Sequence, residues 1–295
     1  MDQLECMRVF VAVADTGGFA PAARLLRASP PVVTRAVAAL ERRLGTRLLN
    51  RTTRQVRLTE AGERFLADCK RILAELQDAE ALARNAHIEP QGLLAVTAPV
   101  MFGRMHIAPV LFDFLAQHPK VSAHALFVDR IINLMEEGFD VALRIDELSD
   151  SSLTAIKVGT VRRVVVASPA YLAANGVPRT PADVENHRAI GSGRALWRFR
   201  GAAASTPQPR MQLAVNGGDV AIACALAGHG LARPLSYQVD EELRDGRLQV
   251  VLADHELPAL PVQLVYPEGR QAAAKVRAFV DFAVARLRTH PALRR

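Results

Sequence analysis

The sequence predicts a multi-domain protein, in which a mainly α-helical N-terminal domain is joined by one long helix to a two-lobed α/β domain. Three observations support this prediction: positive charge is concentrated near the N-terminus, a long helical pattern follows it, and strand and helix patterns alternate through the remainder. A length of 295 residues also favours about two domains. We expect the domain limits at 1–58, 59–88 for the linker helix, 89–92 for a hinge, and 93–295.

The positive charge forms one patch. Residues 18–58 contain nine arginines and one acid, Glu41, which gives a net charge of +8, against +7 for the entire chain. The other residues therefore sum to about −1, and a basic patch of this kind is typical of proteins that bind a polyanion. A solvated basic helix is the ordinary alternative, and the neighbouring elements have to decide between the two.

Two short helices are predicted ahead of the centre of this patch. The first should end near Thr16 and pack through apolar residues at helical spacing, which are Leu4, Met7, Val11 and Ala14. The second should begin near Pro21 and end near Arg27, with Ala22, Leu25 and Leu26 on its inner side. Only a tight turn would then separate it from the next helix.

A third helix is predicted over 30–44, because Ser29 suits the N-cap, Pro30 the first turn and Gly45 the C-terminal end. Its buried stripe should be Val33, Val37, Leu40 and Leu44, with small and polar residues facing outward. Two helices joined by so tight a turn predict a helix-turn-helix, whose second helix reads bases in the major groove. Thr34 and Arg35 are the expected readers of base edges, and Pro30-Pro31 a steric positioning element.

Residues 47–58 alternate between apolar and polar side chains, which predicts two short strands with a basic tip, a wing beside the recognition helix. Arginines at the tip would reach the DNA backbone or the minor groove. The expected DNA-binding residues are therefore Ser29, Pro30, Pro31, Thr34, Arg35, Arg42, Arg51, Thr52, Thr53 and Arg54.

Thr59 should cap a long fourth helix that continues to roughly Ala86. Its apolar residues step by four and three, which is a heptad seam and indicates a partner helix. Packing on its own domain is the alternative, but a helix of roughly 27 residues, about 40 Å long, exceeds so small a domain. We expect a homodimer, with the contact residues Phe65, Cys69, Ile72, Leu76 and Ala79.

Beyond the hinge the alternating pattern predicts parallel α/β layers in two lobes with a cleft between them. Lobe I is expected over about 93–162 and 267–295, and lobe II over about 163–266. The expected strands are 93–98, 121–128, 140–145, 161–167, 211–215 and 258–266. The expected helices are 99–116, 131–137, 169–174, 181–186, 218–227, 236–244 and 271–287.

Strand-to-helix turns at 97–100 and 215–219 would bring helix N-termini to the rim of the cleft, where free N–H groups favour an anion. Arg144, at the end of its strand, is either a carboxylate clamp or a member of a structural ion pair. The expected ligand is a small organic anion, either a small organic acid or an aromatic carboxylate.

Several segments of the N-terminal region occur together and in order: MRVFVAV at 7–13, AARLL at 22–26, LERRLG at 40–45, LLNRTTR at 48–54 and LTEAG at 58–62. In this combination they resemble the DNA-binding domain of LysR-type transcriptional regulators. Two departures stand out, because Ala20 replaces the usual capping Ser or Thr and Pro30-Pro31 replaces the more frequent helix start. The second removes a side-chain hydrogen bond from a position that otherwise contacts DNA.

The C-terminal region resembles the effector-binding domain of the same family, itself similar to periplasmic solute-binding proteins, through EEGFDVALR at 136–144, SPAYL at 168–172, GHGL at 228–231 and KVRAFV at 275–280. Residues 191–209 match least and are expected to form a variable loop. The resemblance implies a transcription factor that acts on double-stranded DNA as a dimer or dimer of dimers, with RNA polymerase as a further partner. It implies the effector-binding residues Thr97, Pro99, Val100, Arg144, Ser168, Asn216 and Gly217.

Other classes of protein are less well supported. We expect no enzyme activity, cofactor or metal site, because the Gly-rich pairs at 191–193 and 228–230 lack a dinucleotide motif and the histidines lack ligand spacing. The expected location is the cytoplasm, since the first residues do not resemble a signal peptide and no apolar stretch is long enough for a membrane span.

Two other functions stay open. One is a solute-binding protein without a DNA role, and the other a DNA-binding protein whose sensor domain does not respond. The three cysteines, Cys6, Cys69 and Cys224, are expected to be buried, reduced thiols, with redox sensing by Cys69 or Cys224 as the alternative.

Overall fold

The computed structural model describes residues 2–51, 56–83, 89–147, 153–191, 196–201, 208–267 and 273–294. The chain divides into two compact units, one of Met1–Leu93 with Ala272–Ala274 and one of Leu94–Gln271 with Lys275–Arg295. The predicted fold class is confirmed: a helical domain with a β-hairpin precedes a larger α/β domain. Among the described residues, no helix combines the length and apolar character needed to cross a membrane.

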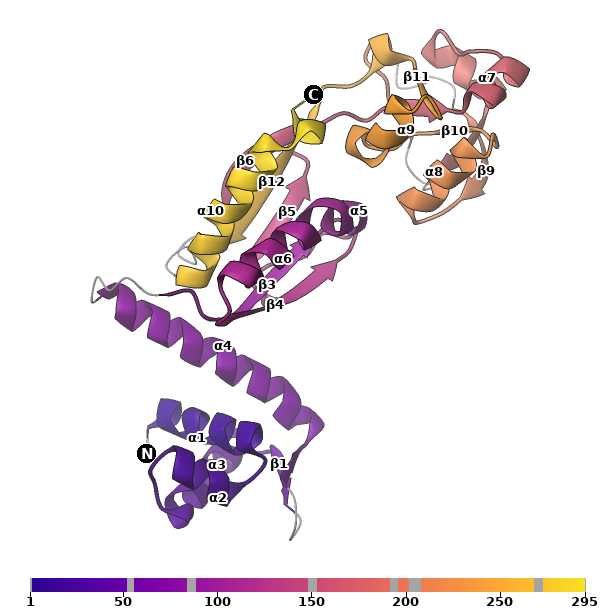
Figure 1. Ribbon diagram of the computed structural model, residues 1–295. Helices are drawn as coiled ribbons and strands as arrows, with labels where there is room; N and C mark the ends of the chain where they lie inside the picture. The colour runs from indigo at the N-terminus through magenta and orange to yellow at the C-terminus, as the bar shows by residue number, and fades with distance from the viewer. Residues whose placement is uncertain are drawn as a thin grey trace. The chain divides into compact units, whose positions relative to one another are not determined.

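The first unit is a winged helix-turn-helix domain followed by a long helix (Figure 1). Its two strands pair antiparallel, with Asn50 opposite Arg57. The elements are α1 (Gln3–Thr16), α2 (Phe19–Leu25), α3 (Pro30–Leu44), β1 (Leu49–Arg51), β2 (Val56–Leu58) and α4 (Glu60–Ala83).

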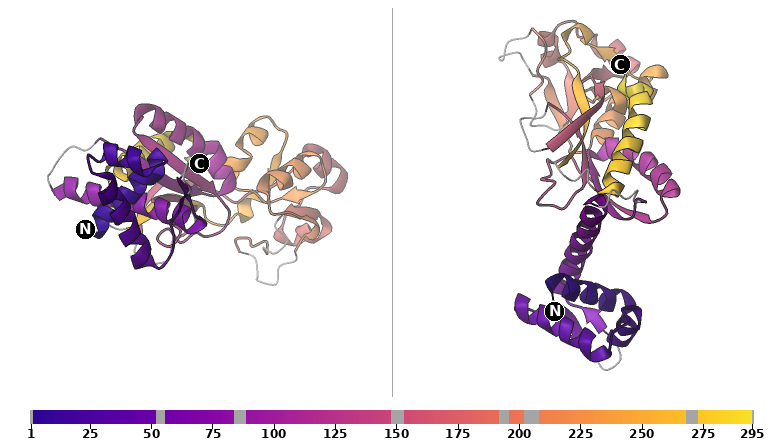
Figure 2. Two further views of the ribbon diagram at one scale, coloured as in Figure 1. Left: turned by 90° about the horizontal axis from the view of Figure 1, so that it is seen from below. Right: turned by 90° about the vertical axis from the view of Figure 1, so that its left-hand side faces the viewer.

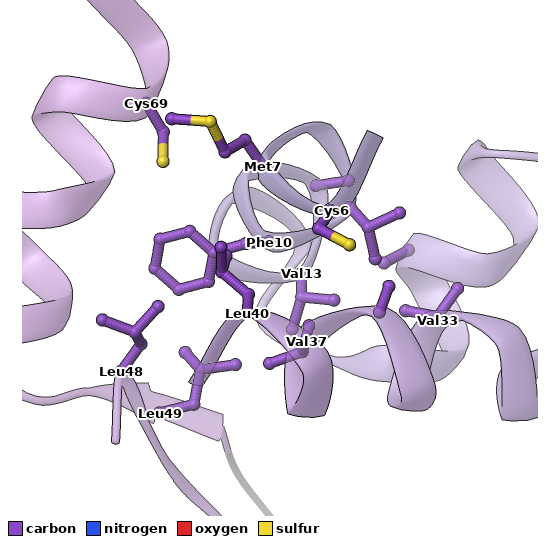
Figure 3. Packing of buried hydrophobic residues seen from close by; sticks show 14 of the residues in the cluster. Cys6, Met7, Phe10, Val13, Val33, Val37, Leu40, Leu48, Leu49 and Cys69 are labelled. Carbon is purple, nitrogen blue, oxygen red and sulfur yellow. The ribbon is translucent and has the colours of Figure 1, made fainter. Parts of the chain in front are cut away.

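One hydrophobic core holds these elements together. Figure 3 shows side chains of α1, α3, the hairpin and α4 converging on the same volume. Phe10, Val13 and Leu40 have at most 2% of their surface exposed, and the ring of Phe10 lies 5.9 Å from that of Phe65 in α4. Burial of each such side chain contributes about 1.5–3 kcal/mol, so the hairpin and the start of α4 belong to the domain.

The predicted inner side of α2 is confirmed for Ala22 and wrong for Leu25 and Leu26. The helix begins at Phe19, before Pro21, and its buried residues are Ala22 and Ala23. Leu25 is 65% exposed and Leu26 36% exposed. Small alanines allow α2 to approach its neighbours closely, and the chain turns away directly after Leu25. In α3 the start and the end are as predicted, but Leu44 is 40% exposed, because the helix ends at the surface there.

Two predicted helix caps differ in outcome. Ser29 has the extended backbone of an N-cap but makes no side-chain capping hydrogen bond. The Thr59 hydroxyl does cap α4, since it accepts a hydrogen bond from the Gly62 N–H at 2.9 Å and donates one to the carbonyl of Arg47 at 2.8 Å. Thr59 therefore fixes the start of α4 to the segment that enters the hairpin.

The first lobe of the α/β domain is a five-stranded mixed sheet in the order β4-β3-β5-β12-β6. Helices α6 and α10 lie side by side on one face (Figures 1 and 2), and the rings of Phe114 and Phe279 meet there at 5.3 Å. The strands are β3 (Gly92–Ala98), β4 (Val121–Phe127), β5 (Val141–Ile145), β6 (Leu153–Val161) and β12 (Leu260–Pro267). The helices are α5 (Val100–Phe102), a π-helical turn (Gly103–Ile107), α6 (Ala108–Gln117) and α10 (Ala274–Thr289).

The second lobe is a smaller five-stranded sheet in the order β11-β7-β10-β8-β9. Its strands are β7 (Val165–Ala167), β8 (Arg188–Gly191), β9 (Arg210–Ala214), β10 (Leu231–Ala232) and β11 (Gln249–Val251). Its helices are α7 (Pro169–Asn175), α8 (Gly218–Leu226) and α9 (Asp240–Arg244). Short 3₁₀ turns occur at Pro181–Asn186, Ser236–Gln238, Ala253–His255 and Pro291–Leu293.

Three predictions for this domain are wrong. Both sheets are mixed, since β12 runs antiparallel to β5 and β6, and β7 antiparallel to β10 and β11. Strand β12 lies in the first sheet, so the limit at residue 266 between the lobes is wrong. Residues 131–137 form turns, because the Asn133 side chain accepts hydrogen bonds from the N–H groups of Met135 and Glu136 and competes with a helix.

Candidate functional site

The outward face of α3 carries the side chains predicted to meet DNA. Pro31, Arg35 and Arg42 are exposed, and Thr34 is half-buried beside them. Ser29 and Pro30 are exposed at the start of the helix. The side chain of Arg51, and Thr52, Thr53 and Arg54 entirely, lie outside the described residues.

The remaining arginines of the basic stretch also face solvent. All those whose side chains are described are exposed: Arg24, Arg27, Arg35, Arg42, Arg43, Arg47 and Arg57. Exposed arginines of this kind can contact phosphates, which supply most of the affinity of DNA-binding domains.

The Thr34 hydroxyl is partly engaged within the helix. Its Oγ1 donates a hydrogen bond to the carbonyl of Pro30 at 3.0 Å. Its oxygen retains lone pairs, so Thr34 can accept a hydrogen bond from a base amino group or present its methyl group to thymine. Arg35 is the stronger donor of the two.

The seam expected on α4 is used differently along its length. Cys69 is completely buried in the core of its own domain, and Phe65 and Ile72 pack against that core. Cys69 is therefore not a dimer contact, because the small domain covers the first turns of the helix. Leu76 lies beyond these contacts and is half-buried, while nothing is described of the side chain of Ala79.

A cavity of about 700 Å³ opens between the two lobes of the α/β domain. Of the predicted effector residues, Thr97, Pro99, Arg144, Asn216 and Gly217 line it. They come from the ends of β3 and β5 in one lobe and from the turn between β9 and α8 in the other. Five of the seven predicted effector residues therefore line one cavity, and they come from both lobes.

Two predicted effector residues do not line the cavity. The Ser168 side chain is buried and accepts a hydrogen bond from the Tyr171 N–H at 3.3 Å, so it caps α7. The backbone N–H of Val100 donates to Oδ1 of Asp129 at 3.0 Å. The helix N-terminus at Val100, predicted to receive an external anion, is occupied by the carboxylate of the protein itself.

Arg144 is neither in an ion pair with a described residue nor fully free. Its Nη2 donates a hydrogen bond to the carbonyl of Ile132 at 2.6 Å, which holds the side chain along the cavity wall. The guanidinium has further N–H groups. Arg144 thus supports the 128–132 segment while it lines the cavity.

The sequence-based prediction missed Arg233, which follows β10 and lines the cavity. Its guanidinium carbon lies 5.4 Å from the ring centre of Phe199 and 6.0 Å from that of Trp197. Burial, and to a smaller degree repulsion by Arg163, lowers the pKa of Arg233 to about 10. Arg233 could have been predicted from the sequence, because it stands at the end of an apolar strand, and this was the reason for naming Arg144.

Trp197 belongs to the segment that was expected to be a variable loop. It is 5% exposed, and its backbone N–H donates to Oε1 of Gln208 at 2.6 Å. The Arg200 N–H also donates to the carbonyl of His255 at 2.9 Å. These hydrogen bonds fix the 196–200 segment, through which Trp197 lines the cavity.

Two chain crossings connect the lobes and are hydrogen-bonded to each other. The Ser236 N–H donates to the carbonyl of Arg162 at 2.7 Å, and the Arg162 N–H donates to Oγ of Ser236 at 3.1 Å. The Val164 N–H donates to the carbonyl of Pro234 at 3.0 Å. The crossings therefore form a two-stranded connection at the edge of the cavity.

The part of the chain that the structure describes gives little support to a metal site or to redox sensing by a cysteine. It contains no group of three or more His, Cys, Asp or Glu side chains placed to hold a metal ion. Burial, and secondarily Asp68, raises the pKa of the Cys69 thiol to about 12, which makes it a poor redox sensor. Cys224 is half-buried, against the prediction.

Comparisons with known proteins agree with this architecture. Residues 4–63 match the family described as bacterial regulatory helix-turn-helix protein, lysR family, and residues 87–288 match LysR substrate binding domain. An HTH-type transcriptional repressor of Pseudomonas aeruginosa is 35% identical over 96% of this chain and 92% of its own length. The HTH-type transcriptional regulator CrgA of Neisseria meningitidis is 32% identical over 96% of both chains.

Solved structures extend the similarity to the whole fold. The structure of CrgA matches with a TM-score of 0.61 and 32% identity, covering 96% of this chain and 98% of its own. The full-length structure of the Vibrio cholerae virulence activator AphB matches with a TM-score of 0.60 and 27% identity, covering 97% and 99%.

Proposed function

The chain belongs to the LysR family of transcriptional regulators, and from this premise we propose how its two domains divide the work. The family and its relatives are regulators rather than enzymes. We propose that α3 and the wing bind operator DNA, and that the cavity between the lobes binds a small organic anion whose binding changes the affinity for that DNA. The observation that carries this proposal is the cavity, which is lined by residues of both lobes.

The DNA-binding residues are proposed to have two roles. Arg35 and Thr34, at the centre of the outward face of α3, read base edges. The surrounding arginines, with Arg42 on α3 and Arg51 and Arg54 on the wing, bind phosphates or the minor groove and supply affinity. Pro30 and Pro31 limit how closely the start of the helix approaches the bases, since neither offers a side-chain hydrogen bond.

The proposed assembly is a homodimer or a dimer of dimers that acts in the cytoplasm on promoter DNA and contacts RNA polymerase. The continuation of α4 beyond its contacts with the domain core, with Leu76 and Ala79, is the proposed dimer contact. Two α3 helices in a dimer would read two half-sites. The solute-binding alternative loses its support, because the N-terminal domain matches a DNA-binding family at 4–63.

Binding of the protein to its own upstream DNA and to random DNA tests the division of roles. Replacement of Arg35 by Ala should weaken specific binding by about 1–3 kcal/mol and leave random DNA less affected, because a base contact is lost. Replacement of Arg54 by Ala should weaken both DNAs alike. Arg277→Ala, an exposed arginine on α10, controls for the loss of one charge.

Equal losses on both DNAs for the Arg35 and Arg54 variants would remove the assigned roles. Footprinting with and without small organic anions then tests the sensor. A footprint that no such anion alters would favour the alternative of a DNA-binding protein with a non-responsive sensor domain.

A further inference from the structure

We propose that Arg163 and Arg233 together hold the anionic group of the effector, and that this group is a carboxylate on a molecule with an apolar body. The inference rests on the proposed function, because it assumes that the cavity between the lobes is the effector site. It places the anion at the edge of the second lobe, rather than at a helix N-terminus.

The backbone brings the two arginines to one side of the connection between the lobes. An isolated antiparallel bridge pairs Arg163 with Leu235. Directly opposed residues of an antiparallel pair point to the same face, as do residues two apart on one strand. Arg233 stands two residues before Leu235, so its side chain lies on the face of Arg163, and both line the cavity.

The Arg233 side chain is fixed in position, but not all of its N–H groups form hydrogen bonds. Its Nη2 donates a hydrogen bond to the carbonyl of Arg198, and Phe199 and Trp197 cover its faces. Its Nε is buried and has no hydrogen-bond partner among the described residues. An unpaired buried donor on a cation is destabilising. An anion in the cavity would offset the cost of burying the Arg233 charge.

The charges around the two arginines also favour an anionic ligand. Neither Arg163 nor Arg233 forms an ion pair with a carboxylate among the described residues. The charged residue that perturbs the pKa of Arg233 is the cationic Arg163, which lowers it. Two cations at one wall without a counterion predict an external anion, and a guanidinium pair suits the two oxygens of a carboxylate.

Among the described residues, no carboxylate of the opposite lobe forms an ion pair with Arg163 or Arg233. Oδ1 of Asp129 accepts from the Val100 N–H, and Oδ1 of Asp146 accepts from the Glu147 N–H. Asp129, Asp146 and Glu147, all from the first lobe, also line the cavity, so an anion is repelled from that side. The free carboxylate group is therefore directed to the second lobe.

Part of the remaining lining is apolar. Ile131 lines the cavity with 86% of its surface exposed, which leaves an uncovered aliphatic contact beside Ile132, Ile190 and the ring of Trp197. Burial of such apolar surface under a ligand is favourable. A purely inorganic anion would leave Ile131 in water, whereas the apolar body of an aromatic or aliphatic carboxylate would cover it.

Fluorescence of Trp197, the single tryptophan of the chain, reports directly on this wall. The full-length protein is titrated with benzoate, with its neutral counterpart benzamide, and with sulfate, each to about 10 mM. Benzoate should produce a saturable change, and benzamide and sulfate should bind at least about tenfold more weakly, since one lacks the charge and the other the apolar body.

The variants Arg233→Gln and Arg163→Gln should each bind benzoate at least about tenfold more weakly. Arg198→Gln is the matched control, because the Arg198 side chain is exposed and does not line the cavity. Unchanged benzoate affinity in both cavity variants, equal binding of benzamide, or no saturable response of the unmodified protein to benzoate would overturn the inference. Sulfate binding as tight as that of benzoate would overturn the carboxylate assignment.

The same samples are tested for binding to the upstream DNA without any added anion. If the arginine variants bind DNA normally and bind benzoate with unchanged affinity, only this inference is contradicted. If the unmodified protein shows no specific DNA binding, the proposed function is contradicted. If Arg233→Gln fails to fold, Arg163→Gln decides, since the exposed Arg163 side chain has no part in the core.

Discussion

Glu41 of α3 accepts a hydrogen bond from the backbone N–H of Leu48 at 2.9 Å, and the same oxygen accepts one from the Leu49 N–H at 3.1 Å. The single acid of residues 18–58 thus joins the recognition helix to the first strand of the wing. Leu48 and Leu49 are both buried, so their N–H groups have little access to water. The charge opposed to DNA binding is therefore kept for a structural reason.

Replacement of Glu41 by Ala should lower the free energy of unfolding of the DNA-binding domain by about 1–3 kcal/mol, because two N–H groups lose their acceptor. Glu41→Gln should cost less, since the amide oxygen can still accept. Urea unfolding followed by circular dichroism measures the difference. Both variants remove the same negative charge. If Glu41 acted only through its charge, the two variants would therefore have equal stability and equal DNA affinity, and this result would contradict the assignment.

Arg27 adopts a left-handed backbone conformation, with φ of 52°, in the turn between α2 and α3. This conformation costs about 1 kcal/mol or more for a residue with a Cβ atom and almost nothing for glycine. We expect Arg27→Gly to be more stable to heat than Arg27→Ala, and both variants to bind DNA equally weakly, because each loses the same charge. Equal melting temperatures would show that the turn is not strained.

Leu76 lies on α4 beyond the contacts of the helix with its own domain, and it carries the test of the proposed dimer. Leu76→Asp should shift the protein toward monomers in sedimentation velocity, because a buried carboxylate opposes helix pairing. Ala67→Asp is the control, since Ala67 is exposed and lies about half a turn of rotation around the helix from residue 76. An unchanged oligomer in Leu76→Asp would place the contact elsewhere.

The N-terminal domain was predictable because its signals are local. The ends of α3 follow from Pro30 and Gly45, and the cap of α4 from Thr59, whose effects act within a few residues. Leu25 and Leu26 were misassigned for the opposite reason. Helical spacing indicates which residues share a face, but whether that face meets a partner depends on the neighbouring elements. The burial of Cys69 is the same problem, because a heptad seam looks identical against its own domain and against a second chain.

The α/β domain was predictable in class but not in pairing. Strand β12 is recognisable as a strand, yet its place in the first sheet depends on contacts with residues more than a hundred positions away. The cavity shows the same division. Thr97, Arg144 and Asn216 could be predicted because they lie at strand ends, which line a cleft of this kind. The shared face of Arg163 and Arg233 could be identified only from the structure, in which the pairing of residue 163 with residue 235 places two cations on one face.

His106 should make the stability of the α/β domain depend on pH. It is 7% exposed, neither ring nitrogen has a partner among the described residues, and the rings of Phe102 and His290 lie 4.7 and 4.5 Å away. Burial, and secondarily His290, lowers the pKa of His106 from 6.5 to about 4. The unfolded chain therefore takes up a proton near pH 6.5 that the folded protein refuses until about pH 4.

The stabilising effect of a neutral His106 is thus complete above pH 6.5 and is lost progressively as the pH falls to 4, by an amount on the order of 3 kcal/mol. His106→Phe removes this titration and keeps a ring in the contact with Phe102. The unfolding free energies of the variant and the unmodified protein, measured from pH 7 to pH 4, should therefore converge or cross in favour of the variant. The buried His187, whose pKa is also lowered, and the carboxylates with lowered pKa titrate in both proteins and cancel in the difference. Parallel curves over this range would mean that His106 is accessible to a proton in the folded state.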